Sequence, residues 1–427
     1  MRTSRTRRLT VLLVVIGLAA AVQTGAAGTA GAGDPQPTGI GNGTLTIGQL
    51  APQTGQLNNL LPSFTAPVTL AIEEMNAAGG VLGQPVGYAL ADDGSNPDVA
   101  IASIEQLLEG GSVDAIMGPA TSGTTIGIID QVRAAKVLDC SGSNTSAELS
   151  KLNSGGYYFR TTPPDTLQGP ALAKLLLRDK RKRVAIIARR DTYGVGLAKE
   201  VKAAVTKGGA KVVADVNFDP DAQSFDADVQ KLSRAKPDAT VVIAFETDGA
   251  DVVRTMIGQG LGPQQVPLYT ADGLRNNRFG ALVDPNNPGV VAGIKGTAPA
   301  AAPAGVQHPF LERFAATGID PIFSAYYYDC AMLTALAAEK AKSDDPAKMK
   351  NVFASNTRGK VKCNTFADCK TALDAKKTIE YQGASATFPH MNKFGKFEPR
   401  AGAYEIWSYD TDARGVTEPP ETQIRVG

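Results

Sequence analysis

Apolar runs and helical apolar spacing alternate along most of the chain. Leu45–Leu50 has the pattern of a strand, and Thr65–Ala78 has that of an amphipathic helix stopped by Gly79-Gly80. The rest of the first half is expected to hold strands and helices in turn: Val86–Ala91, Pro97–Leu108, Asp114–Met117, Thr124–Ala135 and Val137–Leu138. Such alternation is typical of parallel sheets covered by helices, so we predict an α/β fold.

The same alternation restarts after Pro163-Pro164, which we interpret as a crossover. The second unit is expected to hold strands and helices in turn: Arg183–Ala188, Gly196–Lys207, Val212–Val216, Phe225–Ala235, Thr240–Phe245, Asp248–Gly258 and Val266–Tyr269. The Ala/Pro-rich stretch Ala298–Pro303 marks a second break. Helices near Phe310–Ala316 and Ala325–Lys342 and a β-rich part at Tyr381–Tyr409 follow it. We predict two similar α/β units that share the C-terminal part.

Residues 1–32 have the features of a secretory signal peptide. A basic start is followed by the apolar run Leu9–Val22 and by small residues ending at Ala30-Gly31-Ala32. Residues 33–43 form a Gly/Pro-rich lead-in. No later stretch has about 18 consecutive apolar residues, which excludes a polytopic membrane protein. We expect an exported protein without a lipid-anchor cysteine, because the first cysteine is Cys140.

Charge narrows the possible partners. The 427-residue chain has a formal net charge of +1, and loss of the four arginines of the signal changes it to −3. This balance gives no electrostatic case for binding nucleic acid or an anionic membrane surface.

Cysteine and histidine usage narrows the chemistry further. Cys363 and Cys369 flank a short polar segment, and an oxidising compartment favours a loop disulfide between them. Cys140 and Cys330 either pair or stay as buried thiols. The two histidines lie in other segments than the close cysteine pair, so no zinc site, and no cofactor, is expected.

Several short motifs resemble those of one family. Asn76–Gly83, followed by Asp92-Asp93 and Pro97, is similar to the first lobe of type I periplasmic binding proteins. Further motifs resemble the same family in the same order: Gly118–Ser122, Ser143–Thr145, Phe159–Thr162 and Asp191–Gly194. The resemblance runs from about Leu45 to Tyr409 and points to the leucine/isoleucine/valine-binding proteins of ABC importers.

The resemblance implies a two-lobed α/β scaffold, with a mainly parallel sheet in each lobe and three crossovers. Lobe one would comprise residues 44–161 and 294–386, and lobe two residues 162–293 and 387–410, with 411–427 as a polar tail. Hinge closure around a solute would create the face that ABC permease subunits in the membrane recognise. The resemblance also implies a monomer that acts in the periplasm or at the cell surface.

The first candidate site follows the predicted strand Asp114–Met117 and precedes a helix. Free backbone N–H groups at such a turn, with the helix dipole and hydroxyl donors, favour an anion. In the family this turn and the next βα turn hold the α-carboxylate and share the α-amino group of an amino acid. The matching positions are Ser122, Ser143 and Thr145. The alternative is that Ser122 is only a helix N-cap.

The second candidate site is Asp272, just after the predicted strand Val266–Tyr269. It matches the family acid that binds the ligand ammonium, and a carboxylate is the group that a buried cation requires. The alternative is an Asp-Gly turn that needs no ligand. Tyr193 matches a tyrosine that covers the ligand from lobe two, and its alternative is a packing aromatic.

Apolar walls are expected to set the side-chain selectivity. Phe245 and Phe323 match family positions that touch the ligand side chain, and Ala120 and Thr121 would lie at the pocket floor. The alternative for each phenylalanine is the core, where this residue is common.

The chain departs from the family at Gln56–Pro62. Asn58-Asn59-Leu60-Leu61 stands where the branched-chain binders offer an aromatic residue followed by glycine. This departure is therefore also compatible with a larger or more polar solute.

Enzyme motifs are missing from the sequence. There is no Gly-x-Ser-x-Gly elbow, and Lys199 takes the place of the third glycine in a possible dinucleotide loop. The best interpretation is the solute receptor of an ABC importer, binding a small-molecule amino acid that is branched-chain or otherwise apolar. The alternatives are a sensor or receptor for a short amide, urea-like or aromatic acid solute, and an exported hydrolase.

Overall fold

The structure is a computed structural model that describes residues 40–111, 113–385, 388 and 397–427. These residues belong to one compact unit, Thr38–Gly427. The predicted signal peptide, most of the lead-in and the predicted boundary between residues 386 and 387 lie outside the described residues. None of the helices in the described part is long and apolar enough to cross a bilayer.

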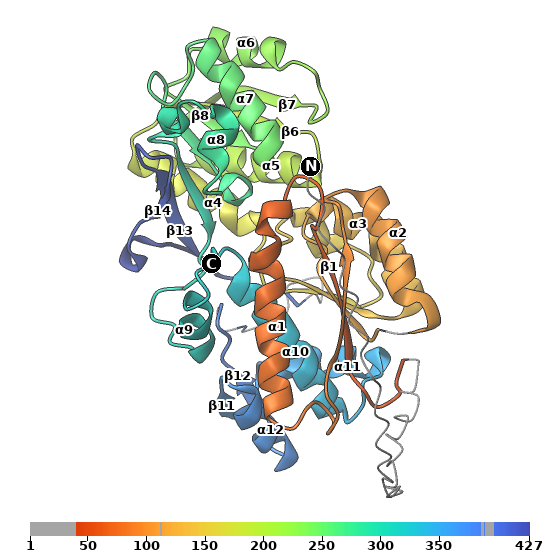
Figure 1. The fold of residues 1–427 in the computed structure, drawn as a ribbon. Helices are drawn as coiled ribbons and strands as arrows, with labels where there is room; N and C mark the ends of the chain where they lie inside the picture. Colours follow the sequence, from red (N-terminus) through yellow and green to blue (C-terminus); the bar gives the residue numbers. More distant parts are fainter. Residues whose placement is uncertain (1–39, 112, 386–387, 389–396) are drawn as a thin grey trace, which may run out of the picture. The chain divides into compact units, whose positions relative to one another are not determined.

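The first sheet has five parallel strands in the order β2-β1-β3-β4-β5. They are β1 (Thr46–Ala51), β2 (Gly87–Asp92), β3 (Ala115–Met117), β4 (Leu138–Ser141) and β5 (Tyr158–Arg160). The helices around this sheet are α1 (Leu61–Ala77), α2 (Pro97–Leu108), α3 (Ser122–Ala135) and α10 (Ser324–Ala341). α1 packs with α10, and α2 with α3, on opposite sides of β1 (Figure 1). The residues of α10 from Ser324 to Glu339 are all buried, which makes it the central helix of this lobe.

The second sheet has eight strands, with β15 added to the path β14-β13-β10-β9-β8-β6-β7. Its parallel strands are β6 (Arg183–Arg189), β7 (Lys211–Phe218), β8 (Ala239–Ile243), β9 (Leu268–Thr270) and β10 (Lys295–Pro299). The antiparallel strands are β13 (Gly402–Tyr409), β14 (Gly415–Thr417) and β15 (Ile424–Val426). β8 is buried along its whole length, as expected for a strand covered on both faces.

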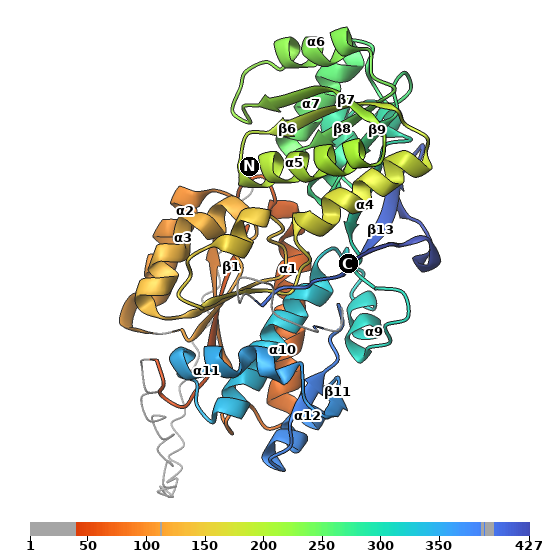
Figure 2. The ribbon, with the colours of Figure 1, turned by 180° about the vertical axis from the view of Figure 1, so that it is seen from behind.

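Helices cover both faces of the second sheet. They are α4 (Asp165–Arg178), α5 (Thr192–Lys207), α6 (Asp226–Ala235), α7 (Glu246–Gly258) and α8 (Phe279–Val283). α4 and α5 lie on one side of β6–β8, and α6 and α7 on the other (Figures 1 and 2). The remaining elements are α9 (Pro309–Ala315), α11 (Pro346–Val352), α12 (Phe366–Asp374) and the parallel pair β11 (Val361–Cys363) and β12 (Ile379–Tyr381). The two sheets with their helices form the predicted two-lobed α/β fold.

Two regions differ from the sequence-based boundaries. β10 pairs with β9 and β13, so it lies in the second sheet, although residues 294–386 were predicted to belong to lobe one. The predicted break, Ala298–Pro303, overlaps the end of β10. The chain therefore leaves the second sheet only after Pro299. Residues 411–427 were predicted as a polar tail, yet they include β14 and β15, which pair with β13.

Several helices begin earlier than predicted because side chains or backbone groups cap them. The Thr121 hydroxyl caps α3, and the Asp191 carboxylate caps α5 through the Gly194 N–H at 2.7 Å. β8 ends at Ile243, before Phe245, which was predicted as the end of that strand. Phe245 is the N-cap of α7 instead.

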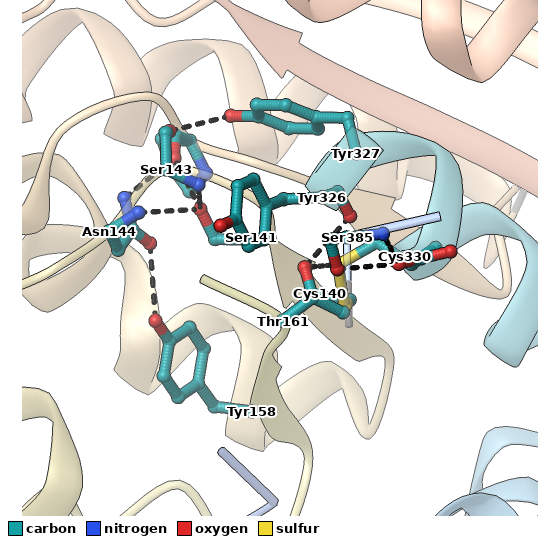
Figure 3. The surroundings of a disulfide bond; sticks show 12 residues. Cys140, Ser141, Ser143, Asn144, Tyr158, Thr161, Tyr326, Tyr327, Cys330 and Ser385 are labelled. Atoms are coloured by element: carbon teal, nitrogen blue, oxygen red, sulfur yellow. Dashed lines mark hydrogen bonds between the residues drawn. A yellow bond between two sulfur atoms is a disulfide. The ribbon is translucent and has the colours of Figure 1, made fainter. Parts of the chain in front are cut away.

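Two disulfides fasten lobe one. The predicted bond between Cys363 and Cys369 joins β11 to α12. The sequence did not decide whether Cys140 and Cys330 pair. In the structure they form a disulfide that joins β4 to α10 (Figure 3).

We expect the two disulfides to contribute unequally to stability. The loop-closure model gives about 5 kcal/mol for Cys140–Cys330 and about 2 kcal/mol for Cys363–Cys369, because the paired residues are 190 and 6 positions apart. Urea denaturation of the Cys140→Ala/Cys330→Ala and Cys363→Ala/Cys369→Ala proteins measures this. Equal losses of unfolding free energy would contradict the expectation.

Candidate functional site

A small cavity lies between the two lobes, where parallel strands of both sheets end. Its wall consists of residues that follow β1, β3, β4, β6, β8 and β9 or precede α10: Leu57, Leu60, Phe64, Ala120, Thr121, Ser122, Ser143, Thr145, Tyr193, Phe245, Asp272, Gly273 and Phe323. The structure thus brings every residue predicted to contact the ligand to one cavity. Its water-accessible volume is about 20 Å³, the room of one or two water molecules. This space is too small for an organic solute, so the wall residues of the two lobes would have to move apart to admit one.

The turn after β3 offers hydrogen-bond donors to the cavity. Thr121 caps α3, with its hydroxyl accepting a backbone hydrogen bond of 3.2 Å from the first turn. Ser122 is the first helical residue, and its hydroxyl accepts the Ser146 N–H at 3.1 Å. The hydroxyl hydrogen of Ser122 therefore stays available for donation. The Asp93 carboxylate accepts the Ala120 N–H at 2.7 Å and fixes the turn. A helix N-terminus with a free hydroxyl hydrogen suits an anion.

Ser143, in the turn after β4, is held by two neighbours. Its hydroxyl donates to the Ala120 carbonyl at 2.7 Å and lies 2.9 Å from the Tyr327 hydroxyl (Figure 3). Since the hydrogen of Ser143 is engaged with Ala120, Tyr327 donates to Ser143. The Ser143 side chain can then accept one further hydrogen bond but cannot donate one.

A buried ion pair between Arg160 and Glu398 holds the turn after β4 in place. Arg160, the last residue of β5, donates from Nε to Glu398 at 2.9 Å. Its Nη1 donates to the carbonyls of Asn144 at 3.3 Å and Ser146 at 2.8 Å, and its Nη2 donates to the Ser150 hydroxyl at 2.6 Å. Arg160 is 1% exposed and Glu398 7% exposed. The guanidinium therefore fixes the backbone around Thr145 as well as neutralising Glu398.

Asp272 lies on the opposite side of the cavity, directly after β9. Its Oδ1 accepts hydrogen bonds from Gln168 Nε2 at 2.5 Å and from the Tyr193 hydroxyl at 3.3 Å. Burial raises the pKa of Asp272 to about 6, against the opposing effect of these two hydrogen bonds. Both side-chain bonds use the same oxygen, so neither of them occupies Oδ2, which can accept from a cation.

A second acid, Asp165, lies close to Asp272. It is fully buried, and its carboxyl group lies next to the Thr145 side chain, which favours the charged form. Burial, and then the charge of Asp272, raise the pKa of Asp165 well above its usual range. This shift favours the neutral form of Asp165 beside the Asp272 carboxylate. The Asp165 N–H donates to the Thr145 carbonyl at 2.7 Å and joins α4 to the lobe-one turn.

Aromatic rings form the apolar part of the wall. Tyr193 and Phe245 stack with their ring centres 5.3 Å apart and their planes 6° apart. Phe323 faces them from lobe one and has a left-handed backbone with φ of 61°. Such a conformation is unfavourable for phenylalanine and marks functional sites when the surroundings enforce it.

Several wall residues were missed by the sequence analysis. Leu57 and Leu60 come from Gln56–Pro62, the segment in which the chain departs from the family that it resembles, and Phe64 lies just beyond it in α1. The departure from the family pattern pointed to this segment, but it did not show which of its side chains line the cavity. Gly273 also lines the cavity, and a side chain there would clash, because a Cβ would lie 2.5 Å from the Ala244 carbonyl oxygen.

The cavity therefore has three chemically distinct parts. Hydrogen-bond donors and a helix N-terminus lie on the lobe-one side, a carboxylate lies on the lobe-two side, and apolar side chains fill the remainder. Within the described residues, no group of His, Cys, Asp and Glu side chains could hold a metal ion. This arrangement fits a small zwitterion with an apolar side chain.

Comparison with known proteins agrees with this geometry. Residues 44–367 match the family model described as periplasmic binding protein, and the chain belongs to that family. The Leu/Ile/Val-binding protein BraC3 of Rhizobium johnstonii is 28% identical over 57% of this chain and 65% of its own length, just under two thirds. The leucine-, isoleucine-, valine-, threonine- and alanine-binding protein of Pseudomonas aeruginosa is 28% identical over 74% of this chain and 83% of its own length.

The fold agrees with a solved structure as well. The branched-chain amino acid transporter substrate-binding protein LivJ of Streptococcus pneumoniae, solved with isoleucine, has a TM-score of 0.70 and 21% identity. The match covers 90% of this chain and all of that chain. These likenesses place the chain among the type I members, in the Leu/Ile/Val-binding branch.

We expect Arg160→Met to destabilise the protein by about 3–5 kcal/mol, because it removes a positive charge that binds the buried Glu398 carboxylate. The double variant Arg160→Met/Glu398→Leu should recover much of this loss, since it removes both charges. Urea denaturation of the three proteins measures the difference. A loss below about 1 kcal/mol in the single variant would show that water or other groups compensate Glu398.

Proposed function

We propose that the protein is the extracytoplasmic solute receptor of an ABC importer and binds an apolar amino acid, such as leucine, isoleucine or valine, between its lobes. The carboxylate would bind at Ser122 and the start of α3, with Thr145 nearby. The ammonium would bind Asp272 and the free lone pair of Ser143. Tyr193, Phe245 and Phe323 would enclose the side chain, above Ala120 and Thr121.

One observation carries this proposal. A buried carboxylate, Asp272, lies across one cavity from a helix N-terminus that has a free hydroxyl hydrogen, Ser122. Opposite charges on one small solute would satisfy both sides at once. A solute without a cation, such as an aromatic acid, would leave Asp272 buried and unpaired, which is unfavourable.

We further propose that binding takes place without catalysis. The Ser122 hydroxyl accepts a backbone N–H, and the residues that line the cavity include no histidine to activate it. Residues 1–32 would direct export to the periplasm or the cell surface. Closure of the lobes on the solute would present a monomer to the permease.

A thermal-shift screen of the mature protein against the amino acids tests this function. A ligand at a hundredfold excess over its dissociation constant should stabilise the protein by about 2.7 kcal/mol. Leucine, isoleucine or valine should raise the melting temperature. A response to none of the amino acids, together with a response to an amide or an aromatic acid, would overturn the solute class.

Asp272→Asn should weaken amino-acid binding by about 2–5 kcal/mol, because the ammonium would be buried without its counterion. N-acetylation of the amino acid should be comparably harmful, since it removes the ammonium itself. Isothermal titration calorimetry measures both effects. The matched control is Asp251→Asn on the exposed face of α7, which should bind normally. Unchanged affinity in Asp272→Asn would remove that residue from the site.

Binding should also weaken in acid. The pKa of Asp272 is raised to about 6 in the empty site, and the ammonium needs the ionised form. Affinity should therefore be constant between pH 7 and 8 and fall below pH 6, approaching tenfold per pH unit. Titrations from pH 8 to pH 5 measure this, and Asp272→Asn should flatten the profile. An affinity that rises toward pH 5 would contradict the assigned roles.

A further inference from the structure

Arg189 lies at the carboxyl end of β6, beside the cavity but outside its wall. Its guanidinium binds two carboxylates of its own lobe, Asp191 from Nε at 2.6 Å and Asp248 from Nη1 at 2.7 Å. Nη1 also donates to the side-chain oxygen of Gln56 at 3.1 Å. Cζ lies 3.9 Å from the centre of the Phe245 ring. One side chain therefore touches two acids, an aromatic wall residue and an amide.

Both acids accept backbone hydrogen bonds at the start of a helix. Asp191 caps α5 by accepting a backbone N–H of its first turn at 2.7 Å. Asp248, in the first turn of α7, accepts the N–H of Phe245 at 2.9 Å. Arg189 thereby joins the starts of the two helices that carry Tyr193 and Phe245. These residues are the stacked pair of the lobe-two wall.

Gln56 belongs to the other lobe. It lies in the segment after β1 and directly precedes Leu57, which with Leu60 lines the cavity from lobe one. The hydrogen bond between Gln56 and Arg189 therefore crosses the cleft. Separation of the lobes to admit a solute would break it.

The charge balance shows what this bond is suited to do. Asp191 and Asp248 already compensate the charge of Arg189 within lobe two, so opening of the lobes would leave no charge unpaired. A hydrogen bond to a neutral amide is also weaker than a buried ion pair. Such a contact can form on closure and break on opening without a large barrier.

We propose that Arg189 is a positioning residue that couples lobe closure to the aromatic wall, with Gln56 as its partner across the cleft. The proposal rests on the proposed function of the cavity. On closure, Gln56 engages the guanidinium that lies over Phe245, and the same movement seats Leu57 and Leu60 against the solute side chain. The segment in which this chain departs from its family thus takes part in selecting the solute.

The test is the rate of solute dissociation in Gln56→Ala, measured by stopped-flow fluorescence with leucine. The bond exists in the closed state, so its loss should raise the dissociation rate about three- to tenfold and leave the association rate within a factor of two. The matched control is Gln53→Ala, an exposed glutamine in the same segment, which should behave as the wild type. Arg189→Lys keeps the charge but not the planar fork, and it should resemble Gln56→Ala.

An unchanged dissociation rate, or an equal change in Gln53→Ala, would overturn the proposal. A second measurement keeps it separate from the proposed function. Spin labels at Glu73→Cys on α1 and Lys202→Cys on α5 report the distance between the lobes without a solute. Gln56→Ala should reduce the population with the short distance, whether or not leucine is the solute. An identical distance distribution would refute the role of Gln56, whereas absence of leucine binding in the wild type would refute only the solute assignment.

Discussion

The arrangement of the site depends on the buried ion pair between Arg160 and Glu398. A planar guanidinium can bind a carboxylate, a hydroxyl and two backbone carbonyls at once, and Arg160 does all of these. The carbonyls belong to the turn that carries Ser143 and Thr145, and Glu398 comes from a part of the chain 238 residues away. A lysine could neutralise Glu398 but could not hold the turn in one orientation. The main contribution of this ion pair to binding is therefore to hold the turn in place, and its net charge matters less.

Much of the fold could be predicted because its signals are local. Parallel strands buried on both faces require short apolar runs, and β6 and β8 show them clearly. The position of the site could also be predicted, since polar side chains after successive parallel strands meet at one edge. Ser122 and Asp272 follow strands of different sheets, so their assignment to one cavity came from the resemblance to a two-lobed family and not from this rule alone.

Features that depend on distant partners could not be predicted in this way. Nothing local distinguishes Tyr327 from its neighbours, and its contact with Ser143 joins residues 184 positions apart. The pairing of Cys140 with Cys330 spans 190 positions and needed the packing of α10 against β4. β10 was assigned to the wrong sheet because a proline-rich break marks where the chain turns but not which partner the strand has already found.

The order of the strands has a consequence for how the protein could evolve. The chain passes from the first sheet to the second after β5, returns after β10, and crosses again before β13. Neither lobe is therefore a continuous stretch of sequence. A single proteolytic cut at one crossing would leave the halves tethered by the other two. Exchange of a whole lobe with a related gene would need several simultaneous joins, so new solute preferences should arise by point changes in the cleft.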